Sequence, residues 1–244
     1  MQNFRGTHKM DDGITDLDFR PRPTADRPLL GLTVLVVEDS RFASEAMRLL
    51  CLRSGARIRR ADCIASAQRH LNVYRPAVAI VDLGLPDGSG LDLIARMHAM
   101  RPRVPIILGT SGAEREQSQW QSLESGANGF LAKPLESLGV FQAEIMQHLP
   151  DDLHTNTLRT VNASDVEPDI LAYREDLTHA MDLLALDQPP VGYLKRFLLG
   201  VARSAGDGSL EDRAQGLDAG FARSDQADLR AFLSRKIQGL PMAM

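Results

Sequence analysis

Short apolar runs that alternate with helical patterns limit the fold of this chain more than any other feature. Four strong apolar runs cover residues 33–37, 77–81, 104–108 and 129–132. A weaker run, RIRRA at 57–61, lies between the first two of them. Continuous apolar runs rich in β-branched residues indicate strands that are buried on both faces, as in a parallel sheet. Five alternations of strand and helix predict a doubly wound α/β sheet over residues 31–149.

Polar side chains directly follow most of these runs. In chain order they are Glu38, Asp39, Asp82, Thr110, Ser111, Lys133 and Pro134. In doubly wound sheets, ligands bind outside the carboxyl ends of the strands. We therefore expect three carboxylates, one or two hydroxyls and one ammonium group to meet at one edge of the sheet.

The expected cluster of carboxylates suggests a particular chemistry. Three neighbouring carboxylates repel one another, and a divalent cation such as Mg²⁺, which takes oxygen ligands, relieves that repulsion. A carboxylate such as Asp82 can also accept a phosphoryl group, whose charge Lys133 would help to neutralise. The simpler interpretation is that Glu38 and Asp39 only cap the helix after the first strand.

Four segments, taken together, resemble a known family. VVEDS, VDLGLPDGSG, PIILGTSG and GFLAKP occur in the order and near the spacing of a response-regulator receiver domain, and the resemblance covers residues 32–148. It implies a flavodoxin-like (βα)5 fold with strand order 2-1-3-4-5. It also implies Mg²⁺-dependent phosphorylation of Asp82 by a partner histidine kinase or histidine phosphotransfer protein.

The resemblance also implies a role for each matched residue. The metal site would use the backbone carbonyl of Gly84 and the side chains of Glu38, Asp39 and Asp82. The phosphoryl and switch residues would be Thr110, Lys133 and Phe130, with Ser111 and Pro134 in support. The switch would act on residues 113–148. Two departures are that Gly109 replaces a larger residue, which we expect to loosen the following loop, and that Phe130 replaces the commoner tyrosine.

The remaining segments differ from this region in their composition and in their pattern of apolar residues. Residues 1–30 are polar and predict a flexible arm, and residues 150–168 predict a linker. Residues 169–240 contain four helical patterns, each with one apolar stripe, and predict a small all-α bundle. Ser209 is the expected cap of the third helix. The bundle matches no family that we recognise.

The charge of the C-terminal part bears on its partner. Residues 151–244 hold ten Lys and Arg against fifteen Asp and Glu, a formal charge of −5. A surface that binds DNA needs basic residues to neutralise phosphates. A protein-interaction or dimerisation module is therefore the favoured interpretation, and a DNA-binding transcriptional regulator is the alternative. His179 lacks the lysine and glycine neighbours that are usual in phosphotransfer bundles.

Other classes fit the sequence less well. Phosphohydrolases with an aspartyl nucleophile usually carry a second carboxylate two residues later, where Gly84 stands, so we expect self-modification and no turnover of an external substrate. EDSRF follows the first strand where a nucleotide-binding fold would have a Gly-rich loop. With neither an apolar run near 20 residues nor an apolar N-terminal segment, we expect a cytoplasmic protein without a membrane partner.

Overall fold

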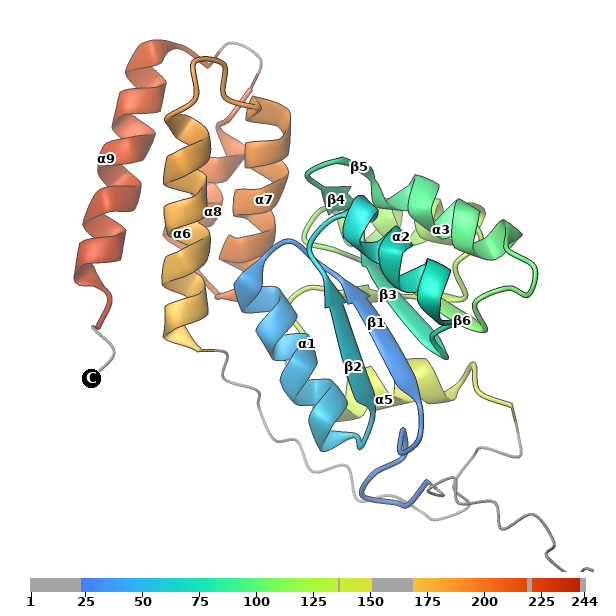
Figure 1. The fold of residues 1–244 in the computed structure, drawn as a ribbon. Coiled ribbons are helices and arrows are strands. Elements are labelled where there is room, and N and C mark those ends of the chain that lie inside the picture. The colour runs from blue at the N-terminus through green and yellow to red at the C-terminus, as the bar shows by residue number, and fades with distance from the viewer. Residues whose placement is uncertain (1–22, 136, 151–168, 219–220, 242–244) are drawn as a thin grey trace, which may run out of the picture.

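A computed structural model describes residues 23–135, 137–150, 169–218 and 221–241. Residues 23–150 form a sheet covered by helices, here called the sheet domain, and residues 169–241 form a group of four helices, here called the helical module. The two lie side by side, with the helical module beside one end of the sheet (Figure 1). Residues 151–168, which contain most of the expected linker, and residues 1–22 of the expected arm lie outside the described residues.

The sheet has five parallel strands in the order β2-β1-β3-β6-β7. The doubly wound α/β class and the expected strand order are therefore confirmed. A short antiparallel hairpin, β4 (Gly84–Leu85) and β5 (Gly88–Ser89), lies between β3 and the helix that follows it. The strands are β1 (Thr33–Val37), β2 (Arg57–Ala61), β3 (Val78–Asp82), β6 (Ile106–Ser111) and β7 (Gly129–Ala132).

Helices cover both faces of this sheet, which explains its continuous apolar strands. Successive side chains of a strand point to opposite faces. In β1, Val34 and Val36 pack in one core with residues of α1 and α5, whereas Leu35 and Val37 pack in the other with residues of α2 and α3. The helices of the sheet domain are α1 (Arg41–Arg53), α2 (Ile64–Val73), α3 (Gly90–Ala99), α4 (Arg115–Glu124) and α5 (Leu138–Met146).

Two boundaries differ from the expected ones. Strand β6 runs from Ile106 to Ser111, so Thr110 and Ser111 lie inside the strand instead of after it. The strand continues because it has pairing partners on both sides: Thr110 is in register with Asp82 of β3 and with Leu131 of β7. The sheet domain also begins earlier than residue 31, because Leu29 is fully buried in its core.

The helical module contains α6 (Ile170–Leu184), α7 (Val191–Ser204), α8 (Gly208–Gln215) and α9 (Arg223–Gly239). Their apolar stripes meet in one core that includes Leu177, Leu198 and Leu233. The cap of α8 is Asp207 and not Ser209, because the Asp207 carboxylate accepts the backbone N–H of Leu210. Within the described residues, no helix combines the length and the apolar character needed to cross a membrane.

Candidate functional site

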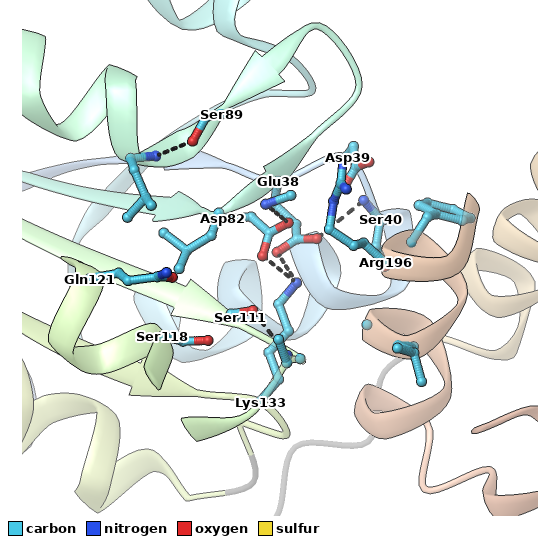
Figure 2. A pocket seen from close by; sticks show the side chains of 18 of the residues that line it. Glu38, Asp39, Ser40, Asp82, Ser89, Ser111, Ser118, Gln121, Lys133 and Arg196 are labelled. Carbon is cyan, nitrogen blue, oxygen red and sulfur yellow. Dashed lines mark hydrogen bonds and ion pairs between the residues drawn. The ribbon is translucent and has the colours of Figure 1, made fainter. Parts of the chain in front are cut away.

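Five of the seven polar residues expected at the strand ends line a pocket of about 380 Å³ at the carboxyl edge of the sheet: Glu38, Asp39, Asp82, Ser111 and Lys133. Figure 2 shows Lys133 reaching up from the end of β7 toward the carboxylates of Glu38 and Asp82. Asp39 lies beside them and is the second residue after the end of β1. Each of four strand ends therefore contributes to one cavity, whereas Thr110 and Pro134 do not line it.

Ion pairs hold the centre of the site together. The Nζ atom of Lys133 lies 2.7 Å from Oε2 of Glu38 and 3.1 Å from Oδ1 of Asp82. The Lys133 side chain is 3% exposed. Two carboxylates and one ammonium group are thus withdrawn from water together, an arrangement that is tolerable only because the charges are paired.

The crowding of charge shifts the pKa values of these groups. Burial, together with the charge of Asp82, raises the pKa of Asp39 to about 7. Burial also raises the pKa of Glu38, although Lys133 opposes that shift. Burial alone would lower the pKa of Lys133, but the charges of Asp82 and Glu38 outweigh it and raise that pKa above its usual value. The cluster therefore carries more negative charge than Lys133 alone can neutralise easily.

The donor set fits a hard divalent cation. One carboxylate oxygen from each of Glu38, Asp39 and Asp82 lies within 4.8 Å of the other two. Mg²⁺ prefers oxygen ligands and is commonly held by one or two carboxylates together with water. Gly84 lines the same pocket, and its backbone N–H donates to Oδ2 of Asp82 over 3.2 Å. Ligation by the Gly84 carbonyl stays a prediction.

Two of the expected switch residues, Thr110 and Phe130, lie in the sheet but do not line the pocket. The Thr110 hydroxyl is fully buried and donates to the backbone carbonyl of Leu131 over 2.7 Å. Phe130 is buried beside Gly109, where an added Cβ atom would meet the side chains of Ser122 and Phe130. The absence of a side chain at Gly109 therefore allows close packing at this position.

The two supporting residues have different positions. Ser111 lines the pocket, and its hydroxyl accepts the backbone N–H of Ala113. Pro134 follows Lys133 through a cis peptide bond. The structure thus brings Ser111 to the carboxylates and places Pro134 next to the lysine in the chain.

Residues of the helical module, which sequence reasoning missed, complete the pocket. Arg196, Phe197, Leu199 and Gly200 of α7 line it, and the Tyr193 hydroxyl donates to Oδ2 of Asp39 over 2.6 Å. In the sequence these residues are part of an ordinary amphipathic helix. Only the docking of the module on the sheet domain distinguishes them, and no local pattern reports that docking.

A family model and several curated proteins match part of this chain. The family model described as "Response regulator receiver domain" matches residues 34–143. The Virulence transcriptional regulatory protein PhoP of Salmonella typhimurium strain 14028s is 36% identical over 103 residues, which are 42% of this chain and 46% of that protein. The Transcriptional regulatory protein PhoP of Escherichia coli O157:H7 is 35% identical over the same shares. The chain thus spans about half the length of these curated relatives.

Similar solved structures include a putative response regulator from Chloroflexus aurantiacus J-10-fl, which is 25% identical with a TM-score of 0.46 and covers 48% of this chain and 96% of its own. A response regulator receiver domain protein from Methanospirillum hungatei JF-1 is 20% identical with a TM-score of 0.45 and covers 50% and 95%. The match of the family model lies within the sheet domain. Residues 34–143 of this chain are a response regulator receiver domain.

Proposed function

We propose that this chain is a two-component response regulator that accepts a phosphoryl group on Asp82 in the presence of Mg²⁺. The observation that carries this proposal is the cluster of Glu38, Asp39 and Asp82 around one pocket, with Lys133 paired to two of them. A phosphohistidine on a histidine kinase or histidine phosphotransfer protein would be the donor. The chain's own change would be self-modification, without turnover of an external substrate.

The site supports a transfer in which each residue has one task. An Asp82 carboxylate oxygen forms a bond to phosphorus, the phosphorus–nitrogen bond of the donor breaks, and its electron pair returns to the imidazole. Lys133, already 3.1 Å from Asp82, stabilises the charge on the transferring group. Mg²⁺, held by Asp39, Asp82 and the Gly84 carbonyl with Glu38 in support, would neutralise the remaining charge when bound.

The proposed output is a change in the helical module. A phosphoryl group adds a charge of about −1.5 to −2. It would draw the Thr110 hydroxyl toward Asp82, and Phe130 would move into the space that is vacated. In this proposal the helical module is a protein-interaction or dimerisation module. Cytoplasmic localisation is part of the same proposal.

DNA binding is a second candidate for the output. The curated relatives are named transcriptional regulatory proteins, although the match covers only 46% of their length. A mobility-shift assay with random duplex DNA and the full-length protein, with and without phosphorylation, separates the two candidates. Salt-sensitive retardation would support DNA binding, and phosphorylation-dependent dimerisation without retardation would support the interaction module.

Replacing Asp82 tests the phosphoacceptor assignment. The Asp82→Asn variant should lose all Mg²⁺-dependent labelling by acetyl phosphate, because its amide is not a carboxylate nucleophile. Labelling is measured as an increase in the intact mass of the full-length protein. Treatment with hydroxylamine should remove the added phosphoryl group. Asp92→Asn is the matched control, since Asp92 is an exposed carboxylate in the first turn of α3. Equal labelling of Asp82→Asn and Asp92→Asn would refute the assignment.

A further inference from the structure

The helical module is joined to the sheet domain by contacts at the start of α1, next to the site. The Asp176 carboxylate of α6 accepts the Ser40 hydroxyl over 2.7 Å and the backbone N–H groups of Arg41 and Phe42 over 2.8 and 3.0 Å. The Phe42 ring packs edge-on against Tyr173, with ring centroids 5.7 Å apart, and belongs to the core of the module. The module is therefore fixed to the residues that directly follow Asp39.

One face of α7 forms a wall of the phosphoacceptor pocket. Tyr193, Arg196 and Gly200 lie three and four residues apart, so they share one side of the helix. Gly200 packs so closely on the loop after β6 that a Cβ atom on Gly112 would lie 2.7 Å from its Cα atom. Arg203, one turn further on, donates to the Gly112 carbonyl. The helix backbone thus lies directly against the rim of the site.

Arg196 brings an unpaired positive charge to this rim. Its side chain extends from α7 toward the carboxylates at the strand ends (Figure 2). A Cβ atom on Gly84 would lie 3.6 Å from Nε of Arg196 and also 3.6 Å from Oδ2 of Asp82, so both atoms border the same small space. Among the described residues, no hydrogen bond or ion pair engages this guanidinium group.

We propose that Arg196 of the helical module is part of the phosphoryl-binding site and that phosphorylation of Asp82 tightens the docking of α7 on the sheet domain. This inference rests on the proposed function, and it gives that function a direction. A guanidinium group matches the geometry of phosphoryl oxygens and pairs with them through charge-assisted hydrogen bonds. Before phosphorylation it faces Asp82 across the space beside Gly84, and the arriving charge supplies its partner.

The proposal excludes the opposite direction of control. If phosphorylation released the module, Arg196 would move away from the new negative charge on Asp82. Arg196 is the one cation without a partner that the described residues bring to the rim of the pocket, so this separation is unfavourable. The sheet domain contributes Lys133 to the phosphoryl group in either case, because Lys133 lies on β7's side of the pocket. Among the described residues of the helical module that line the pocket, Arg196 is the one with a positive charge, so it can attract the phosphoryl group on Asp82.

Binding of beryllofluoride tests the proposal, because this anion forms a tetrahedral phosphoryl analogue on a carboxylate. In full-length protein with Mg²⁺, the bound fluoride is followed by ¹⁹F NMR and the affinity by calorimetry. Arg196→Gln should weaken the affinity about tenfold, and Arg196→Lys, which keeps the charge without the planar fork, should weaken it less. Arg235→Gln on α9 is the matched control and should bind like the wild type, because Arg235 is exposed on the helix farthest from the sheet domain (Figure 1).

Amide hydrogen exchange gives the second readout. Beryllofluoride should slow exchange across residues 191–204 in the wild type and in Arg235→Gln but not in Arg196→Gln. Equal affinities for Arg196→Gln and Arg235→Gln, or faster exchange in the wild type on binding, would overturn the role of Arg196 and leave the phosphoacceptor intact. A wild-type protein without a bound fluoride signal, or an Asp82→Asn variant that binds normally, would overturn both proposals.

Discussion

The sheet domain and the helical module use buried polar side chains in different ways. The sheet domain collects Glu38, Asp82 and Lys133 at one strand edge, where they pair with one another. In the part of the module that the structure describes, Asp176 is the only charged residue that is fully buried, and it bonds to the sheet domain instead of to its own helices. The charges of Glu38, Asp82 and Lys133 are therefore paired within the sheet domain alone, whereas Asp176 finds its hydrogen-bond donors only when the two domains are docked.

This difference shows where the two parts depend on each other. A buried carboxylate without a partner costs several kcal/mol, so an isolated module would have to hydrate or protonate Asp176. Burial raises the pKa of Asp176, and the hydrogen bonds from Ser40 and the α1 backbone oppose that shift. Docking is therefore built into the stability of α6, and the phosphoacceptor site lies at the same contact.

Removing Lys133 should have the largest effect on stability. Lys133→Met leaves Glu38 and Asp82 buried without their cation, and we expect a loss of about 3–5 kcal/mol in the free energy of unfolding. Saturating Mg²⁺ should reduce that loss, because a dication replaces the missing charge. Urea unfolding with and without Mg²⁺ measures both quantities.

The control for this prediction lies in the helical module. Lys236 pairs with Asp207 at a partly exposed position, so Lys236→Met should cost about 1 kcal/mol or less, independently of Mg²⁺. Equal losses for Lys133→Met and Lys236→Met would show that the buried cluster is not held together by its lysine. The sheet domain and the helical module would then not differ in how much they depend on buried charge pairs.

The position of this cluster could be predicted from the sequence, whereas the docking could not. Strand β3 ends at Asp82, and strand β7 ends at Ala132, the residue before Lys133. In both cases the end of an apolar run in the sequence predicts where the strand ends. The limits of β6 could not be predicted, because they depend on its pairing with β3 and β7. The N-cap of α8 could not be predicted either, because Asp207 and Ser209 are both suitable capping residues and only the folded helix shows that it begins after Asp207. Tyr193 and Arg196 became site residues only through contacts between domains.

Removing the Asp176 carboxylate should have the second largest effect. Asp176→Ala leaves the Ser40 hydroxyl and two N–H groups at the start of α1 without their acceptor, and we expect a loss of about 2–3 kcal/mol. Exchange at the amides of Arg41 and Phe42 should become faster, as observed by NMR. Asp176→Asn, which retains one acceptor oxygen, should lie between the variant and the wild type. Unchanged exchange in Asp176→Ala would show that the two domains do not share this contact in solution.

The smallest effect is expected at the neighbouring residue of the same helix. Glu175 also links α6 to the start of α1, through an ion pair of 3.4 Å with Arg41, but the two side chains are 46% and 71% exposed. Exposed ion pairs contribute little because water screens the attraction and ordering the side chains costs entropy. Glu175→Ala should therefore change the free energy of unfolding by less than about 0.5 kcal/mol, and that change should vanish in 1 M salt.

Glu175→Ala and Asp176→Ala remove the same charge from adjacent positions, and both positions contact α1. They differ only in burial and in the groups that lose an acceptor, so their comparison separates net charge from buried hydrogen bonding. A loss for Glu175→Ala as large as that for Asp176→Ala would mean that long-range charge attraction holds the module to the sheet domain. In that case the docking would respond to any added negative charge at this edge, and the specific part assigned to Arg196 would no longer be needed to couple Asp82 to the module.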